Sequence, residues 1–82
     1  MLGKQITSVN QDFGQVLRRL RKEAGLSQEQ LALEAGLQRN YISMMELGTY
    51  QPTLTTIFKL SRALNIKASK IIEALEKKGF RI

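Results

Sequence analysis

Residues 25–48 constrain the fold more than any other part of this chain of 82 residues. Two short segments with apolar residues at helical spacing meet there at Gly36. The apolar positions of the two segments are Leu31, Ala32, Ala35, Leu37, Ile42 and Met45. Because a side chain as small as that of Ala32 lets two helices cross closely, the spacing predicts two packed helices joined by a tight turn at Gly36.

The composition favours helices packed into one small domain. Hydrophobic residues make up 43% of the chain, aromatic residues only 6%, and there is one proline. A chain of this length has room for one modest core, because it buries only about 60% of its unfolded surface. We therefore expect an all-α fold, a compact five-helix bundle.

The residue types that are missing exclude several kinds of chemistry. The chain contains no cysteine and no histidine, which removes disulfides, thiolate metal sites and the commonest general base. The first residues of the sequence lack the apolar stretch that is typical of a signal peptide, and no later segment approaches the roughly 20 apolar residues that a membrane helix needs. We expect a cytoplasmic protein that is not an enzyme, with no metal, no cofactor, no membrane and no small-molecule substrate.

The charge of the chain points toward a polyanionic partner. Thirteen Lys and Arg against seven Asp and Glu give a net charge of +6 and a pI near 10.1. Such a balance is typical of proteins that bind nucleic acid or anionic lipid, although a merely solvated basic surface is the plain alternative. A membrane-surface role is disfavoured, because the basic residues do not form one amphipathic helix with an aromatic face.

Start and stop signals divide the chain into five predicted helices. Residues 1–10 are polar and aperiodic, so we expect a flexible arm before a domain of residues 11–78 and a tail of residues 79–82. The expected helices begin near Asp12, Ser27, Gln38, Thr53 and Lys67, and they end at Gly25, Gly36, Gly48, Asn65 and Gly79.

Each predicted helix has a cap or an apolar face that supports it. Asp12 with Gln15, and Ser27 with Gln30, have the spacing of a capping box, and Asn65 suits a left-handed helix end. The apolar faces of the first, fourth and fifth helices are expected to contain Phe13, Leu17, Leu20, Ala24, Leu54, Ile57, Leu60, Leu64, Ile71, Ile72 and Leu75.

With these positions in order, about residues 13–75 resemble the helix-turn-helix domain of the phage-repressor or XRE type. The resemblance is specific because many positions agree in sequence. They are Phe13, Gly14, Leu17, Leu20, Arg21, Gly25, Leu26, Ser27, Gln28, Leu31, Ala32, Ala35, Gly36, Tyr41, Ile42, Ser43, Glu46, Gly48, Pro52, Thr53, Ala63 and Leu64.

The resemblance implies that residues 38–47 form a recognition helix in the major groove of double-stranded DNA. A helical projection independently separates Ile42 and Met45 from the polar side of this segment. Arg can bracket guanine, Asn or Gln can pair with adenine, and Met can touch a thymine methyl. An ordinary solvated helix face is the alternative. The expected base contacts are Gln38, Arg39, Asn40, Ser43 and Met44.

The resemblance also implies contacts with DNA phosphates. Gln28 matches the first residue of the family's second helix, where an amide and the helix N-terminus meet a phosphate. Ser27 is first of all a helix cap. For the other candidates, plain solubilising charge or polarity is an equal alternative. The expected phosphate contacts are Arg18, Arg19, Ser27, Gln28, Tyr41, Thr49, Tyr50 and Gln51.

Arg21 and Glu46 match positions that form an ion pair in some family members, although they could instead be independent surface charges. Three positions depart from the family pattern. Gln38 is a weaker helix cap than the usual Ser, Thr or Asp, Leu47 replaces a polar residue, and Lys67 replaces a cap.

The function that the resemblance implies is a sequence-specific transcriptional regulator of the repressor type, a homodimer on a pseudo-palindromic operator. The expected dimer interface consists of Ile72, Leu75, Phe80 and Ile82, although Ile72 and Leu75 could instead close the monomer core. A controller protein of a restriction-modification operon fits the same features. A protein-interaction module, such as an antitoxin or anti-regulator, is the other class, and Met44 and Leu47 are its support.

Overall fold

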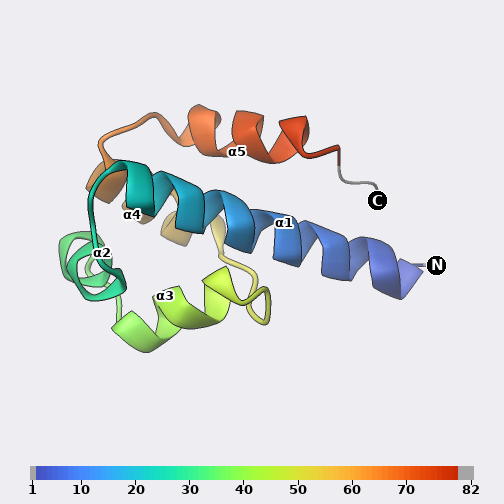
Figure 1. Ribbon diagram of the computed structural model, residues 1–82, viewed down its shortest axis with the longest axis horizontal. Coiled ribbons are helices and arrows are strands. Elements are labelled where there is room, and N and C mark those ends of the chain that lie inside the picture. Colours follow the sequence, from blue (N-terminus) through green and yellow to red (C-terminus); the bar gives the residue numbers. More distant parts are fainter. Residues whose placement is uncertain (1, 80–82) are drawn as a thin grey trace.

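The computed structural model describes residues 2–79, with side chains described from Val9 onward. The described residues contain five helices and no strand, which confirms the expected all-α bundle. Figure 1 shows their arrangement. The helices are α1 (Leu2–Glu23), α2 (Gln28–Ala35), α3 (Arg39–Glu46), α4 (Leu54–Leu64) and α5 (Ala68–Lys77).

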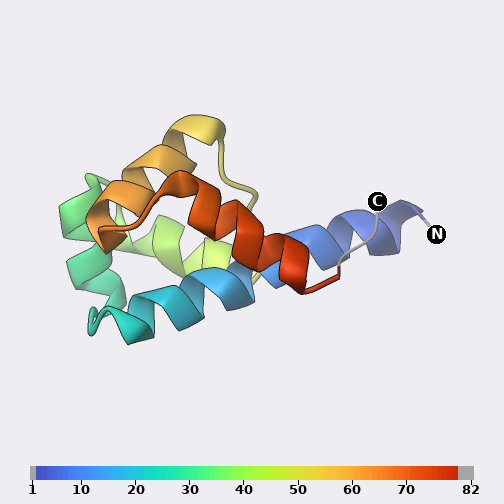
Figure 2. The same cartoon turned by 90° about the horizontal axis from the view of Figure 1, so that it is seen from above.

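Helix α1 begins ten residues earlier than expected, so the predicted start at Asp12 is wrong and residues 2–10 are helical. Once a helix is nucleated, each added residue gains one backbone hydrogen bond, and residues 4–12 contain no glycine or proline to stop it. Asp12 therefore lies inside the helix and caps nothing. At about 1.5 Å per residue, the 22 residues of α1 account for most of the 37 Å long axis of the molecule (Figure 2).

The ends of α2 agree with the sequence signals. The Ser27 hydroxyl accepts a hydrogen bond from the Gln30 amide at 3.0 Å, and the Gln30 side chain accepts one from the Ser27 amide at 2.8 Å. Gly36 ends the helix with a φ of 69°, in the left-handed region where a side chain would be strained. The predicted capping box and glycine stop are both confirmed.

Helices α4 and α5 begin and end close to the predicted residues. The Thr53 hydroxyl caps α4 by accepting from the Thr56 amide, and Asn65 ends that helix with a φ of 59°. Lys67 precedes α5 without a side-chain cap. Leu54, however, is 77% exposed, so its predicted place on the buried face is wrong. Its side chain points outward because the buried stripe of α4 starts two residues later, at Thr56.

Helix α1 lies between α3 and α5, and α2 and α4 close one end of the bundle (Figures 1 and 2). Leu17, Leu31, Ile42 and Met45 are fully buried where α1, α2 and α3 meet. Beyond Leu54, three details of the predicted core differ. Ile72, expected on the apolar face of α5, is 43% exposed, because its neighbour Ile71 takes the core-facing position. Val16 is buried although the predicted stripe did not include it, and Ala24 is exposed because α1 ends before it.

Candidate nucleic-acid interface

Helix α3 has one buried side and one open side. Ile42 and Met45 are fully buried against the core. On the open side, Gln38, Arg39 and Asn40 are exposed, and Ser43 and Met44 are half-buried. The five predicted base-contact residues therefore gather on one surface, as the helical projection indicates.

The residue at the start of α3 has a polar side chain that does not cap the helix. Gln38 occupies the N-cap position, yet its side chain makes no capping hydrogen bond. At the other end, the hydroxyl and the backbone amide of Thr49 both donate to the carbonyl of Met44, at 3.1 Å each. Thr49, a predicted phosphate contact, thus has a structural role in closing the helix.

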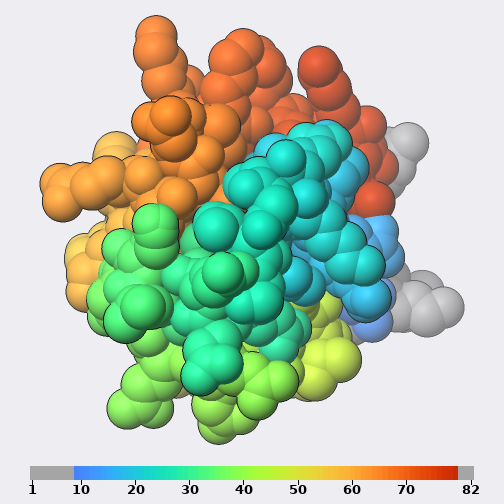
Figure 3. Space-filling view, turned by 60° about the vertical axis from the view of Figure 1, so that its left-hand side comes forward, coloured from blue at the N-terminus to red at the C-terminus, as the bar shows by residue number. Residues whose placement is uncertain are grey.

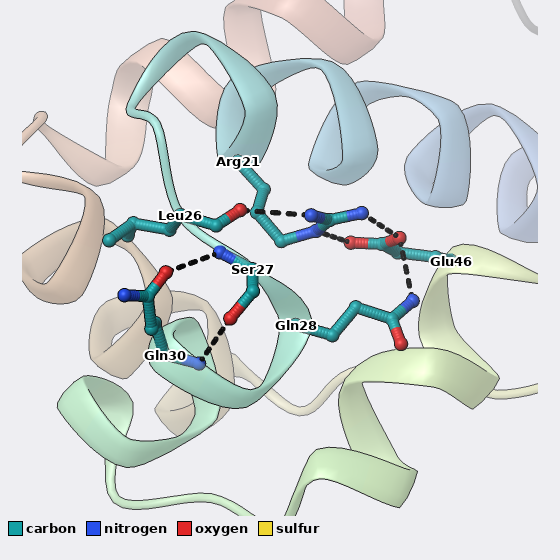
Figure 4. A network of polar contacts seen from close by, with 6 residues as sticks. All are labelled: Arg21, Leu26, Ser27, Gln28, Gln30 and Glu46. Carbon is teal, nitrogen blue, oxygen red and sulfur yellow. Dashed lines mark hydrogen bonds and ion pairs between the residues drawn. The ribbon is translucent and has the colours of Figure 1, made fainter.

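A polar network under α3 ties three helices together (Figure 4). The Arg21 guanidinium donates from Nε and Nη2 to the two carboxylate oxygens of Glu46, at 2.6 Å and 3.0 Å. It also donates from Nη1 to the carbonyl of Leu26 at 2.9 Å. The predicted pair of Arg21 and Glu46 is therefore present, with two parallel bonds that fix its geometry.

The Arg21–Glu46 pair is shielded from solvent, with only 11% and 5% of the two side chains exposed. The hydrogen bond that Arg21 donates to Glu46 raises the pKa of Arg21, against a smaller opposing effect of burial, and the nearby negative charge raises it further. The guanidinium therefore remains charged at any pH at which the protein is studied.

Gln28 belongs to the same network. Its side-chain nitrogen donates to a Glu46 oxygen at 3.0 Å, so one of the two amide hydrogens is used inside the protein (Figure 4). The other amide hydrogen and the first backbone amides of α2 are the groups left for a phosphate. The sequence did not indicate this bond, because it joins residues 18 positions apart.

Gly14 sets the distance between α1 and α3. A Cβ atom added there would lie 2.5 Å from the carbonyl oxygen of Glu46 and 2.6 Å from that of Met45. No side chain fits at this crossing, so the last turn of α3 rests directly on the backbone of α1. A glycine inside a helix costs about 1 kcal/mol relative to alanine, so its presence in α1 could have suggested a packing role, although the sequence does not show what it packs against.

Aromatic residues border the first turn of α3. The Tyr41 and Tyr50 rings meet edge to face with centroids 5.1 Å apart. The Tyr41 hydroxyl lies 3.4 Å from the Thr56 hydroxyl on α4, so it points into the fold. Tyr41, Tyr50 and Gln51 line a shallow hollow of about 530 Å³ beside Gln38. Three predicted phosphate contacts are thus close to the start of α3.

The structure separates the two arginines of α1 that were predicted to contact phosphates. Arg18 follows Gly14 by one turn and is on the side of α1 that faces α3. Arg19 lines a hollow between α1 and α5 together with Lys70 and Lys77. Consecutive helical residues point in directions about 100° apart, so only Arg18 belongs to the α3 surface.

The residues predicted to form the dimer interface differ in their exposure to solvent. Leu75 is 9% exposed and belongs to the monomer core, so its predicted place in an interface is wrong. Its side chain is covered because α5 packs on α1 and α4. Ile72 is 43% exposed and remains available. Phe80 and Ile82 lie outside the described residues.

Two features that other functions would require are absent from the described residues. No helix there is long and apolar enough to cross a membrane. No group of three acidic side chains in the same residues is arranged to hold a metal ion.

Comparison with known proteins assigns the fold and its site to a family. Residues 17–71 match the model of the helix-turn-helix family HTH_3. Control protein C.BamHI of Bacillus amyloliquefaciens is 40% identical over 62 residues, which are 74% of this chain and 76% of that protein. The immunity repressor of Bacillus phage phi105 is 41% identical over 59 residues, which are 72% of this chain and 41% of the repressor.

A solved structure agrees with these relatives. The restriction-modification controller protein C.AhdI of Aeromonas hydrophila superimposes with a TM-score of 0.73 and 44% identity, over 74% of this chain and 92% of that one. The residues that match the family model include the capping box, the glycine turn and α3. This chain is a member of the XRE-type helix-turn-helix family of DNA-binding transcriptional regulators, and it is not an enzyme.

Proposed function

We propose that this protein is a sequence-specific regulator that inserts α3 into the major groove of double-stranded DNA. One observation carries the proposal: the open side of α3 has five side chains suited to base contact, and none of them packs in the core. Because a DNA-binding regulator acts where chromosomal DNA lies, we place it in the cytoplasm.

Base recognition in this proposal depends on the first half of α3. Arg39 can donate two hydrogen bonds to guanine, and Asn40 or the uncommitted Gln38 can pair with adenine. Met44 is suited to touch a thymine methyl. Each bidentate contact discriminates against a wrong base by about 1–3 kcal/mol, so a few of them suffice for a preferred site.

Phosphate contacts would fix this helix in the groove. The N-terminus of α2 presents unpaired backbone amides and the remaining Gln28 hydrogen, which suit an anionic oxygen. Arg18, Tyr50 and Gln51 are exposed beside α3 and supply the other candidates. Tyr41 and Thr49 are weaker candidates, because their hydroxyls are already engaged within the fold.

We further propose a homodimer that uses an apolar surface of α4 and α5. Leu54 and Phe58 are 77% and 62% exposed one turn apart on α4, and Leu54 shares a groove with Ile72. Neighbouring exposed apolar side chains mark an interaction surface. A two-fold dimer would present two copies of α3 about 34 Å apart, which matches one turn of DNA. Ser substitutions at Leu54 and Phe58 should yield a monomer in sedimentation experiments.

Selection of bound sites from random DNA duplexes tests the regulator proposal. We expect an enriched sequence with two-fold symmetry, and an affinity that falls steeply between about 50 and 200 mM salt through counterion release. Arg39→Ala should relax the preference at one base position in each half-site. If no sequence is enriched and the affinity is insensitive to salt, the protein is instead an interaction module, for which the 71% exposed Leu47 is the supporting feature.

A narrower role follows from the relatives that are named as restriction-modification control proteins. We propose that this chain controls such an operon. Sites selected in vitro should then occur upstream of adjacent restriction and methylation genes, and sites next to phage genes alone would favour an immunity repressor.

A further inference from the structure

A second basic surface is formed between α1 and α5, where α1 separates it from α3 (Figure 1). It is a hollow of about 470 Å³, in the size range of binding pockets. We call it the α1–α5 groove. Its lining residues are Arg19, Leu20, Lys70, Glu73, Ala74, Lys77 and Lys78.

The α1–α5 groove has more positive charge than its own carboxylates balance. It contains four cations and one acid. Arg19 pairs with Glu23 at 3.2 Å and Lys70 with Glu73 at 3.4 Å, but all four of these side chains are more than half exposed, so both pairs are weak. Within the described residues, neither Lys77 nor Lys78 has a carboxylate at ion-pair distance, and the Lys78 ammonium donates one hydrogen bond to the Gln15 side-chain oxygen, which carries no charge.

The apolar lining of the α1–α5 groove indicates what kind of occupant fits. Leu20 and Ala74 contribute apolar surface between the cationic side chains. A DNA backbone would satisfy the cations, but its phosphates and sugars offer no aliphatic side chain that could fill the space beside Leu20 and Ala74. An acidic helix face with one protruding apolar side chain would satisfy both.

The outer face of α2 has this composition. Glu29 and Leu33 are one turn apart, Glu34 is adjacent, and α2 contains no basic residue. Leu33 is 82% exposed, and neither glutamate has an ion pair in the described part of the chain. Figure 3 views the molecule from this end, where α2 stands forward between α3 below and α5 above.

We propose that the outer face of α2 in one molecule docks into the α1–α5 groove of a second copy. Leu33 would contact Leu20 and Ala74 of that copy, and Glu29 and Glu34 would pair with Lys70, Lys77 or Lys78. The two surfaces differ, so the contact is head to tail and can link molecules in series, unlike a two-fold dimer through α4 and α5.

Net charge opposes this contact and local charge favours it. Two molecules with a charge of +6 repel one another, but the repulsion is screened beyond about 8 Å at physiological salt. Pairs at contact distance are screened less. The association is therefore weak, and high salt should dissociate it.

Paired charge reversals test the proposal in the full chain without DNA. Glu29→Lys with Glu34→Lys reverses the α2 face, and Lys70→Glu with Lys77→Glu reverses the groove. In sedimentation equilibrium, we expect each double variant to associate about tenfold more weakly than the unaltered chain. An equimolar mixture of the two should associate as well as the unaltered chain, because each supplies the surface that the other needs. Leu33→Ser should weaken association without restoring it in any mixture.

A matched control changes the same charges elsewhere. Lys59→Glu with Lys67→Glu alters two exposed lysines outside the groove, and we expect association close to that of the unaltered chain. Circular dichroism confirms that every variant is folded. The proposal is overturned if the reversed pair fails to associate when mixed, or if the control loses association as much as the groove variant. Because DNA is absent, neither result affects the proposed regulator function.

Discussion

Helices α2 and α3 have the same length of eight residues, but they are held in place in opposite ways. The ends of α2 are closed by its own flanking residues, Ser27 with Gln30 at one end and Gly36 at the other. The start of α3 has no side-chain cap, and its last turn depends on Gly14 and Arg21 of α1. The helix expected to contact DNA bases is therefore positioned by its neighbours.

This difference has a functional reason. A glutamine amide that capped α3 would have its side-chain oxygen engaged by the helix and turned away from the DNA that we propose it contacts. Because the Gln38 side chain makes no capping hydrogen bond, it remains an available polar group at the end of α3 that would enter the groove. The tertiary contacts of α3 offset the missing cap. The following variants test whether α3 depends on α1 and whether α2 is independent of it.

The largest effect is expected for Gly14→Ala. The new methyl group would overlap two carbonyl oxygens of α3, so α3 must shift. We expect a loss of about 3 kcal/mol in the free energy of unfolding, the upper end for overpacked sites, measured by urea denaturation. DNA affinity should fall as well at temperatures where the variant is folded.

Gly25→Ala is the control for that variant. Its φ of 74° makes any side chain strained, but no atom lies within 4 Å of the added Cβ. Only the backbone cost of about 1–2 kcal/mol is expected, with unchanged DNA affinity. Equal losses of stability and of affinity at the two glycines would mean that the α1–α3 crossing is not special.

Glu46→Ala should have the next largest effect. It removes two charge-assisted hydrogen bonds from Arg21 and one from Gln28, and it leaves a shielded guanidinium without its partner. We expect a loss of about 2–3 kcal/mol in the free energy of unfolding, and about half of that for Glu46→Gln. Urea denaturation of both variants measures it, and a loss below about 0.5 kcal/mol would show that the pair does not hold α3.

The pH dependence of this pair follows from the direction of the Arg21 shift. A raised pKa means that the arginine contribution is fully present below its ordinary pKa and is lost only as pH rises through the raised one. The cost of Arg21→Ala should therefore be constant between about pH 6 and pH 9. A cost that changes across this range would show that another group controls the network.

Ser27→Ala and Gln38→Ala compare the two helix starts directly. Ser27→Ala removes a capping bond and should cost about 1 kcal/mol of stability. Gln38→Ala removes no such bond, so it should change stability by only a few tenths of the cost of Ser27→Ala. The preference for particular DNA sequences should change instead. Thermal melting and site selection measure the two effects, and equal costs in stability would remove the distinction between the helices.

A small gain in stability is expected for Gln38→Ser, which gives α3 the cap that it lacks. We expect a gain of about 0.5 kcal/mol in stability together with weaker discrimination at one base position. A gain in stability without any change in sequence preference would mean that Gln38 does not contact a base.

Local signals explain what the sequence could predict. The capping box at Ser27, the stop at Gly36 and the left-handed Asn65 each depend on residues within four positions, and all three are present. Periodicity also divided α3 correctly, because burial of Ile42 and Met45 fixes where the other side chains point. The α1 start failed because Asp12 resembles a cap, although nothing before it stops the helix.

The features that the sequence could not predict depend on which helices meet. Arg18 and Arg19 are adjacent in sequence, and only the positions of α3 and α5 separate them into two surfaces. The close contact at Gly14 and the bond from Gln28 to Glu46 likewise join distant segments. Exposure of Leu54 depends on where α4 meets the core.

Under the proposed function, the division of α3 into a supported side and an open side makes its DNA specificity replaceable. The contacts that hold the helix use Ile42, Met45, the Glu46 carboxylate and backbone carbonyls. The side chains at positions 38–40 take no part in them. These three positions can therefore be randomised together and selected for new operators in one unchanged scaffold, so the chain is a suitable starting point for engineered DNA-binding domains.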